Sequence, residues 1–316
     1  MGMKGDQRAR KEAEIQKWKR EQQKPEYKGY MAVLVVMVAL VHLLDEYASS
    51  ASGAIQSSII NDLFVNQMGV DYTTGLSMLS LVSLLTMAAS LMASVFKAMS
   101  DKYGRKPFFV ISALGMGLGM LICAVAPNAA MYFLGRTVVG FFTATDFQVL
   151  YIMEVSPDNK RGVFYSVTKA IGTVGIVMIA VMRGTFLSVD AANWRMIYLV
   201  PAIAGIGLAV IAFLASRESK VFMERRIETL EKELNAADVK AASKKDKAGM
   251  VAGFKAIIRN KQLRNQTIAT CLFMGAMMAF TGYYESIMTM GGMNTDMVTE
   301  ALFCMGGSSV YQRLHQ

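Results

Sequence analysis

The sequence DKYGRKP at residues 101–107 is a short polar stretch between two long apolar runs. The run before it, residues 73–96, and the run after it, residues 108–126, contain no charged residue. Each run has close to the ~20 residues that an α-helix needs to cross the ~30 Å hydrocarbon core of a bilayer. Gly104 can adopt the positive φ of a sharp turn, and Pro107 suits the first turn of a following helix. The stretch is therefore predicted to be a tight loop between two membrane-spanning helices.

The composition extends this prediction to the whole chain. Its 316 residues are 53% hydrophobic and have a mean hydropathy of +0.34. This is too apolar for an ordinary soluble domain and is typical of an all-α, polytopic membrane protein. The net charge of +9 does not indicate a nucleic-acid partner, because the basic residues lie between the apolar runs.

Residue types that carry catalysis or bind metals are scarce in the sequence. The three cysteines form no CxxC pair, and two histidines leave little room for a metal site. The sequence contains no Gly-Lys-Ser/Thr nucleotide-binding loop and no recognisable catalytic constellation. We therefore expect neither an enzyme nor a bound cofactor or metal.

Seven apolar spans and two charged segments divide the chain. The predicted segments are a cytoplasmic tail (1–29), a six-helix bundle of the membrane (30–216), a cytoplasmic linker (217–262), a seventh span with the start of an eighth (263–303) and a truncated tail (304–316). The predicted spans are residues 30–60, 73–96, 107–126, 130–153, 163–187, 195–216 and 264–290. The first is long enough to be tilted or broken.

The two charged segments differ in pattern. In the linker, apolar residues recur at helical spacing among charged ones, which predicts an amphipathic helix over 218–239, followed by a lysine-rich hinge at 241–249. For the tail, a surface helix near acidic lipid and a solvated segment both fit the sequence.

The basic residues also predict the orientation. Most of the 33 Lys and Arg residues lie in the tail, in the loops after the second and fourth spans, and in the linker, whereas the opposite loops contain only Arg195. Loops rich in Lys and Arg remain in the cytoplasm. We expect the N-terminus and the linker to be cytoplasmic, in a plasma (inner) membrane.

The polar heptapeptide resembles the loop between the second and third helices of the major facilitator superfamily, which reads Gly-x-x-x-Asp-(Arg/Lys)-x-Gly-Arg-(Arg/Lys). Lys97 replaces the leading glycine. Arg136-x-x-x-Gly140 and Glu154-x-x-Pro157-x-x-x-Arg161-Gly162 are similar to segments of the fourth helix and the loop after it. Trp194-Arg195 and Glu218-Ser219 resemble the sugar-porter and organic-ion branches.

The resemblance implies two six-helix halves joined by a basic linker, and a charge network that closes the cytoplasmic face. The sequence supplies the first half and the seventh helix, but helices 8–12 of the family pattern are missing. The residues expected in the cytoplasmic gate are Asp101, Gly104, Arg105, Lys106, Glu154 and Arg161.

Ionisable side chains within spans are costly and are therefore candidates for function. His42, Asp45 and Glu46 lie on one helix face, because their spacings are three and four residues. At ~1.5 Å per residue, Asp45 and Arg136 both lie roughly 8–9 Å below the outer membrane edge. This predicts an ion pair of Arg136 with Asp45 or Glu46. We expect the group to handle solute and protons, and a structural ion pair is the alternative.

Further polar residues lie within the predicted spans. Asp146 and Lys169 have similar depths near the inner edge, which suggests a second, structural ion pair. Arg183 and Glu285 are also intramembrane candidates, with no partner assigned. Three more residues, for which ordinary packing is the alternative, could hydrogen-bond a polar solute: Gln56, Tyr283 and Tyr284.

These features predict a secondary active transporter, coupled to protons, for a small polar solute such as a sugar or an organic anion. Because the second half is missing, we expect self-association or a separate C-terminal half as a partner, besides the lipid bilayer. The alternative is a non-transporting membrane half that acts as an assembly or regulatory module. Dependence of uptake on a pH gradient distinguishes the two.

Overall fold

The computed structural model describes residues 2–24, 29–187, 193–235 and 258–314, and every regular element in these ranges is a helix. The predicted all-α fold is therefore confirmed. The chain forms two compact units. One comprises residues 27–219 and 282–316, and the other comprises residues 1–26 and 220–281. The lysine-rich hinge predicted at 241–249 lies outside the described residues.

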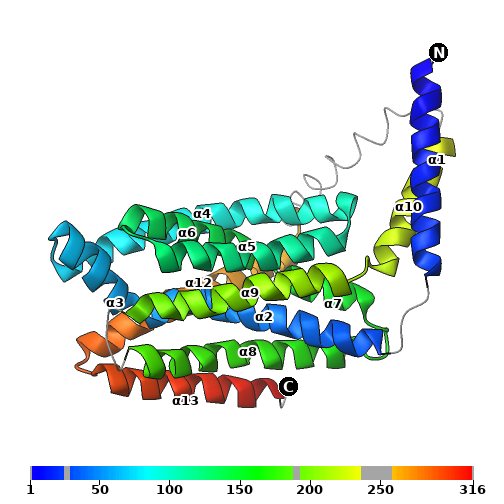
Figure 1. Ribbon diagram of the computed structural model, residues 1–316. Coiled ribbons are helices and arrows are strands. Elements are labelled where there is room, and N and C mark those ends of the chain that lie inside the picture. The colour runs from blue at the N-terminus through cyan, green and yellow to red at the C-terminus, as the bar shows by residue number, and fades with distance from the viewer. Residues whose placement is uncertain (1, 25–28, 188–192, 236–257, 315–316) are drawn as a thin grey trace. The chain divides into compact units, whose positions relative to one another are not determined.

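The larger unit is a bundle of long apolar helices (Figure 1). Among the described residues, six helical segments are long and apolar enough to cross a membrane. They are formed by α2 (Tyr30–Ala54), α4 (Tyr72–Tyr103), α5 (Arg105–Val125), α6 (Ala129–Thr143) with α7 (Phe147–Val155), α8 (Arg161–Phe186) and α9 (Trp194–Ala215). The predicted first span is broken at Ile55, after which come α3 (Gln56–Ile60) and a π-helix, η1 (Asn61–Asn66).

The helix ends carry local signals that explain where the helices start and stop. The side chains of Asp71 and Asn128 accept hydrogen bonds from backbone N–H groups in the first turns of α4 and α6. Such caps satisfy donors that have no partner within the helix. Gly104 separates α4 from α5 with φ 111°, a conformation that other residues rarely adopt. The polar heptapeptide is therefore the sharp turn that its glycine predicts.

Close approach of α2 and α8 places the polar residues of both helices together. Both Gly172 and Gly175 of α8 face α2, and a Cβ at Gly175 would lie 2.4 Å from the Leu43 carbonyl oxygen. Small residues allow membrane helices to approach in this way. Elsewhere, buried Tyr47 of α2 donates a hydrogen bond to the Ile197 carbonyl of α9 at 2.7 Å. These contacts fix the rotation of α2 within the bundle.

Two helices follow the linker. The first, α12 (Lys261–Met290), covers the predicted seventh span, although it is not among the six membrane candidates of the described residues. The second, α13 (Thr295–Leu314), packs along α8 on the side away from α2 (Figure 1). Residues 304–314, which the sequence analysis assigned to a truncated tail, continue α13.

The smaller unit pairs the N-terminal segment with the linker helix. Helices α1 (Gly2–Gln23) and α10 (Lys220–Asn235) lie side by side. Ile15 is buried against Ile227 and Leu230, and Trp18 meets Phe222 edge-on. Three ion pairs join the helices: Lys11–Glu233, Lys19–Glu231 and Glu14–Arg226.

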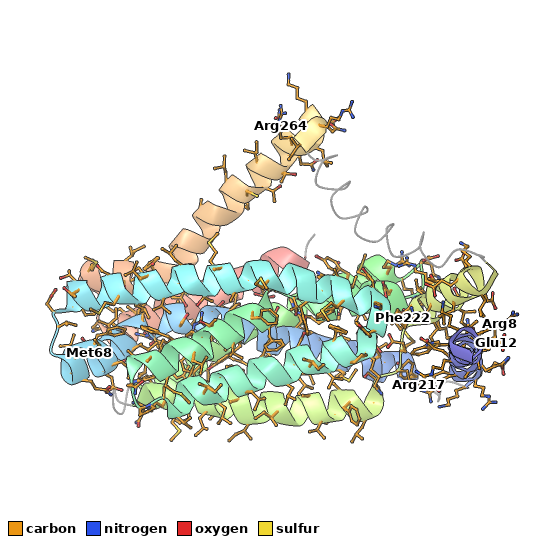
Figure 2. All side chains as sticks on the ribbon, turned by 90° about the horizontal axis from the view of Figure 1, so that it is seen from above. Arg8, Glu12, Met68, Arg217, Phe222 and Arg264 are labelled. Carbon is orange, nitrogen blue, oxygen red and sulfur yellow. The ribbon has the colours of Figure 1, made fainter. Side chains whose placement is uncertain are left out.

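This pairing decides the nature of the N-terminal segment. It is a helix that buries one face against α10, so it is not a fully solvated segment. A position near acidic lipid stays a prediction. Figure 2 shows Arg8 and Glu12 together on the outside of α1, where they form an exposed ion pair. The predicted amphipathic helix of the linker is confirmed as α10.

Candidate functional site

A buried polar group forms on the predicted face of α2. The His42 Nδ1 atom lies 3.7 Å from Asp45 Oδ2, and its Nε2 atom lies 3.4 Å from Glu46 Oε1. The His42 side chain is only 1% exposed. A ring held between two carboxylates in a buried place can exchange or share protons. The structure therefore brings together the three α2 residues that the sequence singled out.

Gln148, which the sequence analysis missed, lies at the centre of this group. Its Nε2 atom is 2.7 Å from Asp45 Oδ2, 3.1 Å from Asp146 Oδ1 and 3.3 Å from His42 Nδ1. Gln148 stands in the first turn of α7, and Asp146 stands in the break before it. The sequence did contain a signal for Gln148, because this amide follows the carboxylate of Asp146 by two residues inside an apolar span.

The break between α6 and α7 has an unusual backbone. Asp146 adopts φ 48°, the one positive φ among the described non-glycine residues. Such conformations are uncommon outside glycine and persist where the surrounding structure fixes them. The conformation directs Asp146 to the same amide that holds Asp45. One ligand atom from each of His42, Asp45 and Asp146 lies within 4.8 Å of the others, a spacing that could hold a metal ion.

Helix α8 closes the group from another side. A Cβ at Gly172 would lie 2.2 Å from His42 Cδ2 and 2.8 Å from its Nε2, so this position leaves room for the ring only as glycine. The positive charge of Lys169, one turn earlier in α8, acts on Asp45. The predicted Asp146–Lys169 ion pair is not found among the described residues, because Asp146 accepts from Gln148 instead.

Arg136 does not form the predicted ion pair with Asp45 or Glu46 in the described structure. Its Nη1 donates to the backbone carbonyl of Ala48 in α2 at 3.1 Å. The depth argument was sound, since Ala48 is one turn from Asp45. Asp45, however, turns toward Gln148 and leaves a backbone oxygen as the acceptor for Arg136.

The predicted solute-binding residues Gln56, Tyr283 and Tyr284 lie in a second polar group. Gln56 Oε1 accepts a hydrogen bond from Ser286 at 2.7 Å, and Tyr283 donates to Ser80 at 2.9 Å. Tyr284 is buried beside them. These bonds join α12 to the first membrane helices of the bundle.

An ion pair between Arg183 of α8 and Glu285 of α12 lies within this second group. The two side chains are 3% and 0% exposed. Glu285 also accepts from the Ser57 backbone N–H at 2.9 Å and from its hydroxyl at 2.8 Å. The sequence identified both charges as intramembrane candidates, but it gave no means of pairing residues 102 positions apart.

Most of the residues predicted for the cytoplasmic gate lie together in a network around Arg105. Its guanidinium lies 2.6 Å from Asp101 and 2.8 Å from Glu154, and it donates to the Ser100 hydroxyl at 2.5 Å. These contacts tie the end of α4 and the start of α5 to the end of α7. Arg161, which was also predicted for the gate, opens α8 and pairs with Asp158 three residues earlier at 2.6 Å.

Glu218, which follows α9, completes the network from another direction. Its carboxylate accepts the backbone N–H of Arg105 at 2.6 Å and that of Lys106 at 3.2 Å. These N–H groups open α5 and have no partner within the helix. A Cβ at Gly104 would lie 2.4 Å from Glu218 Oε2, so this turn accommodates glycine but not a residue with a side chain. Burial raises the pKa of Glu218, although its hydrogen bonds oppose this.

The model of one protein family matches residues 30–312, and its description is Major Facilitator Superfamily. The chain belongs to this family. The match covers the six-helix bundle, both polar groups and the network around Arg105. It also reaches into α13, and the chain is accordingly a multi-pass membrane protein.

Individual relatives are similar in sequence or in fold. YwtG of Bacillus subtilis (strain 168), named as a metabolite transport protein, is 28% identical over 66% of this chain and 47% of its own. Plastidic glucose transporter 4 of Arabidopsis thaliana is 24% identical over 73% of this chain and 45% of its own. The crystal structure of a D-xylose-proton symporter superposes with a TM-score of 0.63 at 15% identity, covering 89% of this chain and 67% of that one. The chain thus spans about half the length of the curated relatives it matches.

Proposed function

We propose that this protein acts in proton-coupled secondary transport of a small polar solute, such as a sugar or an organic anion. The observation that carries the proposal is the group His42–Asp45–Gln148 inside the membrane bundle of a Major Facilitator Superfamily member. Ionisable residues at such depth are rare and are typical of proton relays and solute pathways. The names of the relatives, which include metabolite and glucose transport, support the solute class.

Proton coupling is supported by the density of acids around a single imidazole. Asp45 and Glu46 each face one of the two nitrogens of His42, and Gln148 holds Asp45 in place. A proton bound here neutralises one charge of a buried group, which changes the interactions between α2 and α7. A solute hydroxyl, which can donate a hydrogen bond to Asp45 in place of the Gln148 amide, would alter the same bonds. Proton and solute binding are linked in this way.

The network around Arg105 supports movement between inward- and outward-facing states. It ties α4, α5 and α7 to Glu218 through charged groups that water can replace once the cytoplasmic ends separate. Transporters of this kind alternate access by rocking bundles around a fixed site. We take this network as the cytoplasmic latch of the proposed cycle, and the Arg183–Glu285 pair as a second contact that holds α8 against α12.

The test is uptake of labelled sugars and organic anions into proteoliposomes that contain this chain. We expect accumulation that depends on a pH gradient and stops when a protonophore dissipates it. Asp45→Asn with Glu46→Gln should abolish uphill accumulation while leaving exchange without a gradient less affected. The control is Asp158→Asn, an exposed carboxylate in a loop.

Uphill uptake that persists in the double variant would refute the coupling role of these acids. Uptake absent from folded protein under every gradient would favour the alternative, a membrane module that binds another protein. The α1–α10 pair, with its many exposed charges, is the surface that favours this second function.

A further inference from the structure

The Gln148 amide nitrogen has more possible hydrogen-bond partners than it has hydrogens to donate. This Nε2 atom lies within 3.3 Å of Asp45 Oδ2, Asp146 Oδ1 and the Nδ1 atom of His42, which is an acceptor in the tautomer that carries its proton on Nε2. An amide nitrogen has two hydrogens and can therefore donate to only two of these three atoms. The Gln148 side chain is 1% exposed, and Asp45 Oδ1 is buried with no hydrogen-bond partner among the described residues. An unpaired acceptor in such a place is costly.

The charges around the same point are also unbalanced. Two carboxylates, those of Asp45 and Asp146, converge on it, and Glu46 lies on the far side of His42. Lys169 is the positive side chain that acts on Asp45. Buried carboxylates require cations or hydrogen-bond donors around them. The point occupied by the amide nitrogen is therefore one at which a positive ion would satisfy all three acceptors.

We propose that this point is a binding site for a divalent first-row transition-metal ion. The ligands are His42 Nδ1 and one oxygen from each of Asp45 and Asp146. The Gln148 amide rotates to present Oε1 as a fourth ligand. Imidazole nitrogen with carboxylate oxygens favours ions such as Mn²⁺, Fe²⁺, Co²⁺ and Zn²⁺ over Ca²⁺ and Mg²⁺. The proposal goes beyond the transport function, because binding needs neither a solute nor a gradient.

The distances fit such a site after small adjustments. Tetrahedral ligands at bonds of about 2.0–2.1 Å lie roughly 3.3 Å from one another. His42 Nδ1 and Asp45 Oδ2 are 3.7 Å apart, and all three ligand atoms lie within 4.8 Å. Rotation of the Asp45 and Asp146 carboxylates would bring the ligand atoms from these distances to the spacing of a tetrahedral site. Asp146 stands in a helix break, where its backbone is not bound into the middle of a helix.

The surroundings of His42 support the same assignment. A histidine that binds metal through one nitrogen commonly donates its other N–H to a carboxylate, which fixes the tautomer and the ring orientation. Here Nε2 and Glu46 Oε1 are 3.4 Å apart without the geometry of a hydrogen bond, and a small turn of Glu46 would form that bond while Nδ1 faces the ligand group. Gly172 of α8 lies against the same edge of the ring and restricts its rotation. The ring is thus held with Nδ1 toward the proposed ion.

The experiment measures metal binding to the full chain, purified without a histidine tag and treated with a chelator. Other soft ligands are removed by Cys271→Ser, Cys304→Ser and His315→Gln. Titration calorimetry with Zn²⁺ and the visible spectrum with Co²⁺ give stoichiometry and ligand geometry. We expect one ion per chain, a Co²⁺ spectrum of low coordination number, and no competing binding of Mg²⁺ at the same concentration.

Variants identify the site. His42→Gln and Asp146→Asn should each weaken Zn²⁺ binding by about 10–100-fold. The exposed control Asp158→Asn should bind like the parent. Gln148→Glu, which supplies a carboxylate ligand and keeps the shape of the side chain, should bind at least as tightly as the parent and keeps the test decisive if the other variants fold poorly.

Three results would overturn the proposal: no saturable binding by folded protein, binding unchanged in both His42→Gln and Asp146→Asn, or weaker binding in folded Gln148→Glu. If folded protein shows no saturable metal binding, a proton shared by Asp45 and Asp146 occupies this point instead of a metal ion. Because binding is measured without solute or gradient, its failure leaves the transport proposal standing, and failure of transport leaves the metal site standing.

Discussion

The guanidinium of Arg183 and the carboxylate of Glu285 meet in the interior of the bundle, where both side chains are withdrawn from solvent. Arg183 also donates to the Ala54 carbonyl at the end of α2 and to the Thr299 hydroxyl of α13 at 3.1 Å. One ion pair therefore links α2, α8, α12 and α13. It joins the first six membrane helices to the two helices that follow the linker.

Removing one partner of this pair should be far more harmful than removing both. Arg183→Leu leaves the Glu285 charge buried and uncompensated, which costs roughly 3–5 kcal/mol of the free energy of unfolding. Arg183→Leu combined with Glu285→Leu removes both charges and should recover much of this loss. Thermal unfolding in detergent measures the difference. A double variant less stable than Arg183→Leu alone would contradict the argument.

The exposed pair Arg161–Asp158 is the matched control for this experiment. Its two side chains are 40% and 92% exposed. Exposed ion pairs contribute about 0–1 kcal/mol. Asp158→Ala should therefore change stability little, in the same detergent and by the same measurement.

The pH dependence of stability should reveal the buried carboxylate of Glu218. Burial raises its pKa above the ordinary glutamate value. The folded state then holds a proton at pH values where the unfolded state has lost it, so stability falls as pH rises from the unfolded pKa through the folded pKa. Glu218→Gln lacks this titration. The stability of the parent minus that of Glu218→Gln should decrease with rising pH in this window, and a rising difference would refute the assignment.

Gly172→Ala should disturb the polar group without replacing any of its members. The new Cβ would meet His42 Cδ2 at 2.2 Å, and the ring has little room to retreat. Overpacking of this kind costs about 1–3 kcal/mol. In the control, Gly207→Ala of α9, nothing lies within 4 Å of the new Cβ, so a gain of roughly 0.5–1 kcal/mol is expected. Equal effects in the two variants would argue against the close contact.

The predicted orientation can be checked with an impermeant thiol reagent on intact cells. In a background without the three native cysteines, Gln67→Cys should be labelled from outside and Asn159→Cys should not. Both positions are exposed and lie between predicted spans, on opposite sides of the predicted membrane. Labelling of the second alone would invert the topology that the basic loops predict.

The helices could be predicted because apolar length is a local property of the sequence. The predicted spans agree with α2, α4, α5, α8 and α9 to within a few residues at most ends. The positions where helices break or continue were harder to predict. The αL residue Asp146 divides the fourth span, and the helix of α13 runs through the glycines and serines near its end. Both depend on packing that a local pattern does not contain.

The site could be predicted in part for the same reason. His42, Asp45 and Glu46 share a face because of helical spacing alone. The partners come from distant segments: Gln148 for Asp45, Ala48 for Arg136 and Glu218 for the turn at Gly104. Depth correctly placed Arg136 beside this part of α2, but it could not show which atom it would meet.

Helix α7 has nine residues, and it carries a member of each of two distant polar groups. Gln148 near its start holds Asp45, and Glu154 near its end holds Arg105. Six residues of helix separate them, roughly 9 Å of rigid rod. Because the break at Asp146 separates this short helix from α6, we expect a rigid-body shift of α7 to move Gln148 and Glu154 together, which would link the buried polar group to the network around Arg105.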